Sequence, residues 1–331
     1  MLGDSVTKFE KEFAEFCDVK YCSGVASGLD ALILAIDAFD FPKNSEIIVP
    51  SNTYIATIMA IVRNGFKPIL VEPDIKTYNI DAAKIEEKIT SNTKAILVVH
   101  LYGKACEMDK ITKIASQYEL EIIEDCAQAH GAEFKGQKVG SFGVGCFSFY
   151  PTKNLGALGD GGAITCNNEN YNNKLKSLRN YGSSEKYYNN YLGYNSRLDE
   201  IQAGFLSIKL NILDDITKQK RALAKLYLEN LDDKFIKPVV EESYYDVYHI
   251  FNIRHAQRDE LKKYLFENNI KTEIHYPKSP HQQKSMQGIL ENENYSISQE
   301  IHDTTLSLPL SYSHTKEEIM KVIDVLNGWV E

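Results

Sequence analysis

Short apolar runs alternate with helical patterns through the first half of this chain, and that alternation constrains the fold most. Runs typical of buried strands occupy residues 46–50, 67–71, 95–100 and 121–125. Helical patterns separate them, ending near Val62 and covering 81–89 and 108–118. Strands that alternate with helices at this spacing predict an α/β layer with a largely parallel sheet. In such sheets ligands bind beyond the carboxyl ends of the strands, near Tyr54 and Asp125 here.

Further elements extend this layer on both sides. The patterns predict helices over 6–17 and 31–38, and strands over 144–149 and 163–166. Residues 171–191 are rich in Asn, Lys and Tyr, which indicates an irregular polar loop. A helix over 201–212 follows, with an apolar face that continues through Ile216.

A charge-rich run over 214–221 predicts a domain boundary near residue 215. We therefore expect a large domain over 1–214, with a mostly parallel mixed sheet flanked by helices, and a small C-terminal α+β domain over 215–331. The patterns of the smaller domain predict helices over 218–230, 258–268 and 315–330, and strands over 247–254 and 271–275.

Composition excludes several classes of protein. The net charge of −9 argues against a nucleic-acid surface, although a local basic pocket for a small anion is compatible with it. No stretch approaches the roughly 20 apolar residues that span a bilayer, and the start lacks the pattern of a signal peptide. The six cysteines form no CxxC pair, and most stand in apolar runs. We therefore expect reduced thiols, a cytoplasmic protein and no metal site.

Residues 148–162 carry the strongest chemical signal. A strand-like run leads to Lys153, and four glycines follow within the seven residues 156–162. A lysine at the end of a buried strand is costly unless its charge is paired or its pKa is lowered, and such a lysine can form a Schiff base with an aldehyde. Taken alone, the segment favours a surface lysine in a glycine-rich hairpin, and the neighbouring motifs reverse that preference.

Three neighbouring signals lie at predicted strand or helix ends. Ser27 and Gly28 open an apolar helix, where free N–H groups bind phosphate or simply belong to a capped helix. Asp125 directly follows its strand and is either a helix cap or the charge partner of a cation. Gln128, three residues on, is either a capping-box partner or a second ligand contact.

Together these residues predict a site for pyridoxal phosphate (PLP). The cofactor needs an amine for its aldehyde, a carboxylate for its pyridinium nitrogen, a phosphate cup and a flat partner for its ring. Lys153, Asp125, the Ser27–Gly28 pair and Tyr54 supply one each. Asp125 keeps the ring nitrogen protonated, and Lys153 is then placed to move the substrate Cα proton as a general acid and base.

The sequence resembles the DegT/StrS nucleotide-sugar aminotransferases, PLP enzymes of the aspartate-aminotransferase fold (fold type I). The resemblance runs from about Phe9 to the C-terminus. Residues 124–131 are similar to the family's aspartate segment, 148–162 to its lysine segment and 193–202 to its Gly-Tyr-Asn-x-Arg helix start.

The resemblance implies cofactor roles beyond those of Lys153 and Asp125. Gln128 would contact the ring hydroxyl and Tyr54 would stack on the ring. Ser148 and the backbone at Gly28 and Leu29 would bind the phosphate. Asn195 resembles an asparagine that reaches the phosphate of the other subunit, which implies a homodimer with shared sites.

The resemblance also implies a substrate. Tyr181, His275 and Tyr276 are similar to sugar-contacting residues; the alternatives are loop packing for Tyr181 and a core role for His275. A lysine, rather than the histidine of sugar dehydratases, favours transamination. Residues 274–283 resemble the subgroup that aminates the sugar 3-position of a dTDP-3-keto-6-deoxyhexose with glutamate, in deoxyamino-sugar biosynthesis for lipopolysaccharide or another glycan.

Two rival functions remain at this stage. One is a C4 aminotransferase of a UDP-linked 4-keto-sugar, and the other is a non-catalytic PLP-fold protein that regulates a pathway. Family members usually carry about thirty residues before the stretch that begins here at Gly3. We therefore expect the start to be naturally short or truncated, which bears on full activity because those residues contribute to the dimer and the active-site wall.

Overall fold

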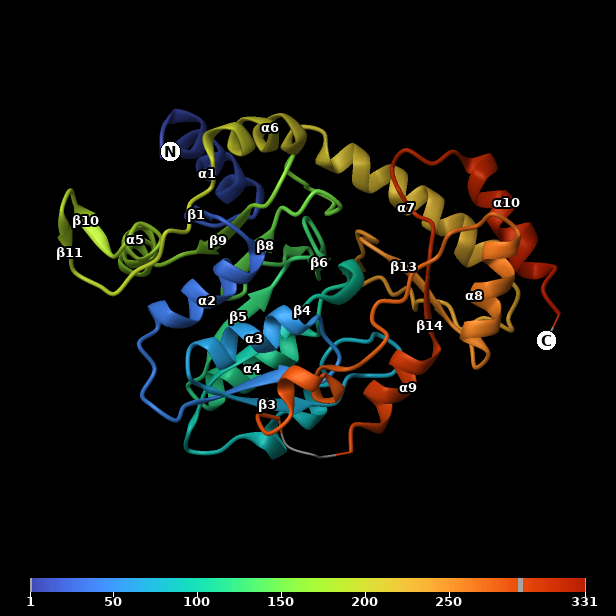
Figure 1. The fold of residues 1–331 in the computed structure, drawn as a ribbon, viewed down its shortest axis with the longest axis horizontal. Helices are drawn as coiled ribbons and strands as arrows, with labels where there is room; N and C mark the ends of the chain where they lie inside the picture. Colours follow the sequence, from blue (N-terminus) through green and yellow to red (C-terminus); the bar gives the residue numbers. More distant parts are fainter. Residues whose placement is uncertain (1, 291–293, 331) are drawn as a thin grey trace.

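The computed structural model describes residues 2–290 and 294–330, and its centre is a seven-stranded sheet (Figure 1). The strands lie in the order β1 (Tyr21–Val25), β9 (Gly162–Cys166), β8 (Val144–Ser148), β5 (Glu121–Asp125), β4 (Thr93–Val99), β2 (Glu46–Pro50) and β3 (Lys67–Val71). Only β9 runs antiparallel to its neighbours β1 and β8. The other pairings are parallel, so the predicted mostly parallel mixed sheet is confirmed.

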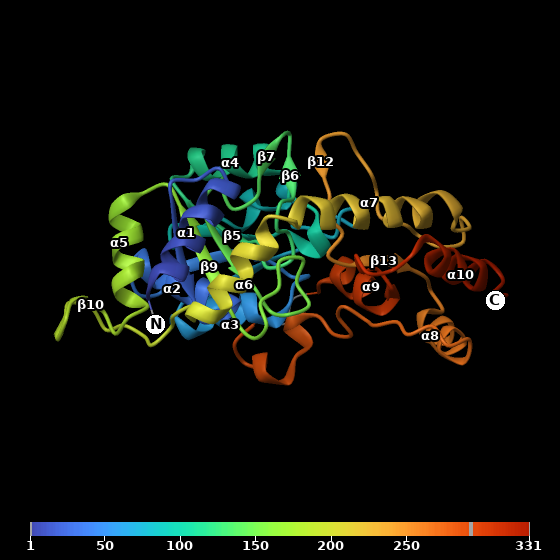
Figure 2. The ribbon, with the colours of Figure 1, turned by 90° about the horizontal axis from the view of Figure 1, so that it is seen from above.

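Helices cover both faces of this sheet because its strands are apolar on both sides. Ile48, Ile96 and Val98 belong to one core cluster, whereas the alternate residues Leu97 and Val99 belong to the other. The first cluster receives α1 (Asp4–Phe16), α4 (Met108–Gln117) and α6 (Glu200–Leu210), and the second receives α2 (Gly28–Ala38), α3 (Ile55–Arg63) and α5 (Glu169–Leu178). Figure 2 shows α4 and α3 on opposite sides of the sheet.

The C-terminal part has a third core cluster of its own. The cluster receives α7 (Leu213–Asn230), β13 (Phe251–Arg254), α8 (Arg258–Glu267), β14 (Thr305–Leu308) and α10 (Lys316–Asn327). The intervening helix α9 (Ser296–Thr304) instead buries Ile301 in the second cluster of the sheet layer. β13 and β14 pair antiparallel, and α10 packs on α7 at the far end of the molecule (Figure 1).

The predicted boundary near residue 215 falls in the first turn of α7. Leu213 belongs to a core cluster of the sheet layer, whereas Leu223 and Tyr227 belong to the C-terminal cluster. The helix therefore bridges the two cores, and the boundary stays a prediction.

Short elements join these layers. They are the strands β6 (Glu133–Phe134), β7 (Gln137–Lys138) and β12 (Tyr244–Tyr245), the hairpin β10 (Ser183–Glu185) with β11 (Tyr188–Asn189), and the 3₁₀ turns η1 (Ala82–Lys84), η2 (Glu86–Lys88), η3 (Leu101–Gly103), η4 (Pro280–Gln282) and η5 (Lys284–Met286). β12 pairs with β6, which ties the C-terminal part to the sheet layer. Among the described residues, no helix has both the length and the apolarity to cross a bilayer.

Two predictions in the sheet layer were wrong. Segment 81–89 forms η1 and η2 instead of one helix; the Asp81 carboxylate caps the first turn by accepting from the Ala83 N–H at 3.0 Å. The first half of the expected loop 171–191 is helix α5. Asn168 caps this helix by accepting from the Tyr171 N–H, and the side chains of Leu175 and Leu178 are buried on its inner face.

Two further predictions failed near the C-terminal part. The expected strand over 271–275 makes a single bridge, between Glu273 and Ser307, because β14 already pairs with β13. The apolar helix predicted to run through Ile216 ends at Leu210, and α7 starts anew at Leu213.

Candidate active site

A cavity of about 570 Å³ opens at the carboxyl ends of β4, β5 and β8, a size suited to a small-molecule ligand. One side, the sheet wall, comes from strand ends and helix starts, and the predicted residues on it are Ser27, Gly28, Leu29, Tyr54, Asp125, Gln128, Ser148 and Lys153. The other side, the loop wall, consists of His249, Ile250, His275 and Tyr276. Ten of the twelve residues predicted for the site therefore lie around one cavity.

Asp125 ends β5 and is almost fully buried. The hydroxyl of Thr57 donates to one carboxylate oxygen at 2.8 Å, and the Ala127 N–H donates to the other at 3.1 Å. Burial raises the pKa of Asp125, although these two donors and the charge of Lys153 counteract the rise. No helix starts at this position, so the helix-cap interpretation was wrong and the carboxylate caps only a turn.

Lys153 lies in the turn between β8 and β9 and faces the cavity, so the surface-hairpin interpretation was wrong. Its N–H donates to the Tyr150 carbonyl at 2.8 Å, which closes the turn. The next glycine is required there, because a Cβ at Gly156 would lie 2.3 Å from the Pro151 carbonyl oxygen. Burial lowers the pKa of Lys153 to about 8, while the charge of Asp125 opposes that shift. The neutral, nucleophilic amine is thereby accessible near neutral pH.

The start of α2 forms a cup beside Ser148. Ser27 caps the helix, its hydroxyl accepting from the Asp30 N–H at 3.1 Å, so the capped-helix interpretation was correct. The same helix start lines the cavity, and the first N–H groups of a helix have no partner within it. A Cβ at Gly28 would lie 2.5 Å from the Ser148 Cβ, so only glycine allows this approach.

Gln128 has a fixed amide orientation. Its Oε1 accepts from the Tyr102 N–H at 2.7 Å, and its Nε2 donates to the Tyr276 hydroxyl at 2.8 Å. The side chain thus presents an N–H donor on the cavity side and caps no helix. The rings of Tyr54 and Tyr276 lie 5.1 Å apart, and Tyr54 remains half exposed.

His275 combines the two roles considered for it. Its Nδ1 lies 2.8 Å from the Ser307 hydroxyl, as in a satisfied core histidine, yet the residue also lines the cavity. Burial lowers the pKa of His275. The next residue, Tyr276, is held by a different contact, because the His302 ring donates to its carbonyl at 2.6 Å.

Two predicted site residues, Tyr181 and Asn195, do not line the cavity of this chain. Both side chains are exposed, and the Arg197 guanidinium lies over the Tyr181 ring at 5.7 Å. Asn195 forms an isolated bridge with Asn180. The single chain therefore leaves these two residues without a role in its own cavity.

Sequence reasoning missed Thr57, Tyr102 and His249. Thr57 stands four residues after Thr53 at a helix start, and their hydroxyls lie 2.8 Å apart; this spacing was a usable signal. Tyr102 and His249 reach the site through contacts between segments far apart in the chain, for which no local pattern exists.

One buried cluster outside the cavity has metal-ligand chemistry. His100, Glu124 and Cys126 place their polar atoms within 4.8 Å of one another. The Glu124 oxygens, however, already accept backbone N–H groups from Gly140 at 2.8 Å and Gly143 at 2.9 Å. We assign no metal to it.

The residues of the sheet wall fit PLP. The cavity has room for a substituted pyridine. The Lys153 amine and the buried Asp125 carboxylate both face it. At Gly28 the absence of a side chain leaves the cup open for a phosphate. Burial raises the pKa of Asp125 and lowers the pKa of Lys153, and the charge of each group counteracts the shift of the other, which lowers the cost of burying the pair.

Comparisons with known proteins place the chain among aminotransferases. The sequence model of the DegT/DnrJ/EryC1/StrS aminotransferase family matches residues 1–327. The chain is 54% identical to the dTDP-3-amino-3,6-dideoxy-alpha-D-galactopyranose transaminase of Aneurinibacillus thermoaerophilus, over 99% of this chain and 91% of that protein. It is 42% identical to a pleiotropic regulatory protein of Geobacillus stearothermophilus, over 86% of this chain and 77% of that protein. The crystal structure of S. venezuelae DesV in complex with a ketimine intermediate superposes with a TM-score of 0.97 at 39% identity, covering 99% of this chain and 90% of that one.

Proposed function

Because the chain belongs to the DegT/DnrJ/EryC1/StrS family of PLP-dependent aminotransferases, we propose that it transfers an amino group from glutamate to a dTDP-linked 3-keto-6-deoxyhexose. The observation that carries this proposal is the shared cavity of Lys153 and Asp125, since transamination needs both a nucleophilic amine and a buried carboxylate. The names of the Aneurinibacillus relative and of a Streptomyces venezuelae relative, 39% identical, support amination at the sugar 3-position.

The residues of the sheet wall divide the work of holding the cofactor. Bound PLP supplies an electron sink for the carbon that loses its proton. Asp125 would pair with the pyridine nitrogen and keep it protonated, and the Thr57 hydroxyl holds this carboxylate in place. Lys153 would hold the cofactor through its aldehyde, and its amine would move the proton to and from the substrate carbon.

The remaining cofactor contacts are part of the same proposal, and the positions of these residues around the cavity support them. Gln128 donates its oriented N–H to the ring hydroxyl, and Tyr54 stacks on the ring. Ser148, Ser27 and the N–H groups of Gly28 and Leu29 would hold the phosphate, because the α2 dipole favours negative charge there. On the loop wall, His275 and Tyr276 contact the sugar.

We further infer a homodimer in which Asn195 and Tyr181 act in the partner's site. Both residues are exposed and lie away from this chain's own cavity. The nearby helix α6 leaves Ile201 72% exposed and Ile208 66% exposed, an apolar face that a second copy would cover. Asn195 would then donate to the partner's phosphate, and Tyr181 would reach the partner's sugar.

We place the reaction in the cytoplasm, where its product would enter the synthesis of a deoxyamino-sugar glycan. All six cysteines are unpaired and buried, which suits a reducing compartment. Burial raises the pKa of their thiols, which keeps the thiols protonated and unreactive. They therefore need no disulfide bonds to protect them.

One set of measurements distinguishes the proposed function from its two alternatives. The name of the Geobacillus relative keeps a regulatory protein in view, and a UDP-linked 4-keto-sugar is the rival substrate. The purified protein should show visible cofactor absorbance and should aminate a panel of dTDP- and UDP-keto-sugars with glutamate. Mass spectrometry measures turnover, and NMR of the product places the amine on carbon 3 or carbon 4. Lys153→Ala is the control without the reactive amine. Cofactor absorbance without turnover of any sugar would reject the enzyme function.

A further inference from the structure

Tyr102 connects the two walls of the cavity although it lies outside the cavity itself. It is 5% exposed and sits in η3, after β4. Its N–H donates to Gln128 Oε1 on the sheet wall at 2.7 Å. Its carbonyl accepts from the Ile250 N–H at 3.3 Å, and its hydroxyl donates to the His275 carbonyl, both on the loop wall. A single residue therefore holds three residues that line the cavity.

The backbone around Tyr102 is held by contacts that do not involve the Tyr102 side chain. Asn79, 2% exposed, accepts from the Leu101 N–H at 3.0 Å and donates to the carbonyls of Lys104 at 2.9 Å and Ala105 at 3.0 Å. On the opposite side, a Cβ at Gly103 would lie 2.8 Å from the His249 backbone nitrogen. The loop is thus locked on both sides, and the Tyr102 ring projects from a rigid base.

We propose that Tyr102 is a positioning residue for substrate binding, because its hydroxyl fixes the backbone of His275 and Tyr276 against the sheet wall. This proposal rests on the proposed function and extends it to a residue that touches neither cofactor nor substrate. When the hydroxyl holds the His275 carbonyl, the Tyr276 ring packs on Tyr54 and its hydroxyl meets the Gln128 amide. The keto-sugar then meets a preformed wall and does not have to order one.

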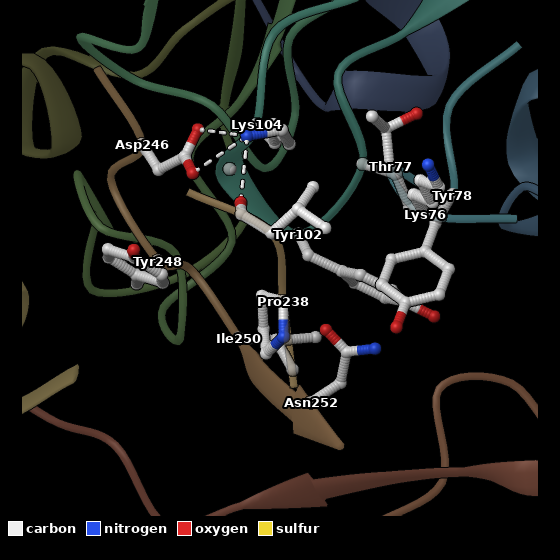
Figure 3. A pocket seen from close by; sticks show the side chains of 13 residues that line it. Lys76, Thr77, Tyr78, Tyr102, Lys104, Pro238, Asp246, Tyr248, Ile250 and Asn252 are labelled. Atoms are coloured by element: carbon white, nitrogen blue, oxygen red, sulfur yellow. Dashed lines mark hydrogen bonds and ion pairs between the residues drawn. The ribbon is translucent and has the colours of Figure 1, made fainter. Parts of the chain in front are cut away.

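Tyr78 provides a matched control in the same part of the molecule. It is 3% exposed, and its ring lies edge-on to that of Tyr102 at 5.8 Å. Both tyrosines line a small pocket of about 20 Å³, with the Lys104–Asp246 ion pair at its other side (Figure 3). Tyr78 does not line the active-site cavity; the Arg254 guanidinium lies over its ring at 5.8 Å. Replacing either tyrosine by phenylalanine removes one buried hydroxyl.

The test compares Y102F with Y78F in the PLP-loaded enzyme. We expect Y102F to raise the KM for the keto-sugar about fivefold to tenfold, the effect of one lost hydrogen bond, with kcat within about twofold and cofactor affinity unchanged. Y78F should leave this KM unchanged while both variants lose similar thermal stability. Substitution of Tyr102 by p-aminophenylalanine, which keeps the ring and a donor, should restore the KM. Equal KM values for Y102F and Y78F would overturn the proposal.

A second measurement needs no turnover. In cofactor-free protein, hydrogen–deuterium exchange of the peptide over 273–279 should be faster in Y102F than in wild type and unchanged in Y78F. Unchanged exchange in Y102F would overturn the positioning role. If the wild type aminates no keto-sugar, the proposed function fails, yet the exchange comparison still decides the role of Tyr102.

Discussion

The sheet wall of the cavity takes its residues from the ends of strands and the start of a helix, whereas the loop wall takes its residues from connecting segments. On the sheet wall, Asp125 is held by Thr57 and by its own turn, within a few residues of a strand that other strands flank on both sides. On the loop wall, His275 is held by Ser307 and Tyr102, which come from distant parts of the chain. The comparison teaches that the ends of regular elements place the cofactor side, whereas connecting segments held only by distant contacts place the substrate side.

The largest expected effect is on the sheet wall. Lys153→Ala should abolish turnover and the covalent attachment of the cofactor, because no other lysine lines the cavity in the described residues. Borohydride reduction and peptide mass mapping should place pyridoxyl on Lys153 alone in the wild type. A label on Lys104 or Lys135 would contradict the assignment. Exchange of the 273–279 peptide should not change in the variant, since the loop wall is held by other residues.

Asp125→Asn should lower turnover by two to three orders of magnitude while the fold survives, because loss of a buried charge partner costs about 3–5 kcal/mol. The amide has nearly the shape of the carboxylate and still accepts from Thr57. Asp246→Asn is the matched control: it also breaks a buried ion pair, with Lys104 at 3.1 Å, but away from the cavity. The control should lose stability with a much smaller loss of kcat. Near-normal turnover of Asp125→Asn would reduce Asp125 to a turn cap.

The difference between the two walls explains which parts of the fold and of the site could be predicted from the sequence. The strands of the sheet and the residues Asp125, Gly28 and Lys153 were predictable because apolar runs and glycine positions specify them locally. The helix over 81–89 was wrong because the Asp81 side chain supports a tighter turn. Helix α5 was missed because two buried leucines outweigh its polar composition.

The loop wall was beyond the reach of local patterns. Its anchor contact joins Tyr102 to His275 across 173 positions of the chain, and the strand β14 that carries Ser307 was not predicted. The sequence named His275 and Tyr276 only through family resemblance. The contacts that hold them needed the three-dimensional structure.

A subunit-mixing experiment tests whether another chain completes the cavity. Asn195→Asp should weaken PLP binding, because it would bring a carboxylate against the phosphate. Lys153→Ala and Asn195→Asp chains, each poorly active alone, should regain activity together. Half of random dimers are mixed and one of their two sites is wild type, so recovery should approach about a quarter of the wild-type activity. No recovery, in a mixture shown by mass to exchange subunits, would place Asn195 in its own chain's site.

The lowered pKa of Lys153 predicts a pH dependence in the cofactor-free protein. Competitive acylation, followed by mass spectrometry, should give half-maximal reactivity of Lys153 near pH 8, well below that of a lysine model peptide in the same tube. The unfolded chain binds this proton more tightly than the folded chain. The contribution of Lys153 to folding stability should therefore rise with pH between about 8 and the ordinary lysine value near 10.5, and Lys153→Met should remove that contribution while the rise due to buried Lys220 remains. An ordinary titration of Lys153 would contradict the burial argument.

The smallest effect is expected from Ser307→Ala on the loop wall. The variant removes the hydroxyl that lies 2.8 Å from His275 Nδ1, while Tyr102 still holds the backbone of that residue. A single hydrogen bond contributes about 1 kcal/mol, so the KM for the keto-sugar should rise about fivefold, with kcat and cofactor affinity nearly unchanged. Ser298→Ala is the control, because its buried hydroxyl donates to the Ser51 carbonyl at 3.0 Å, and Ser298 does not line the cavity. If the two variants change KM equally, the anchor at Ser307 serves stability alone. If only Ser307→Ala does, the side chain of His275 is a sugar contact whose orientation is set by a strand 30 residues away in the chain.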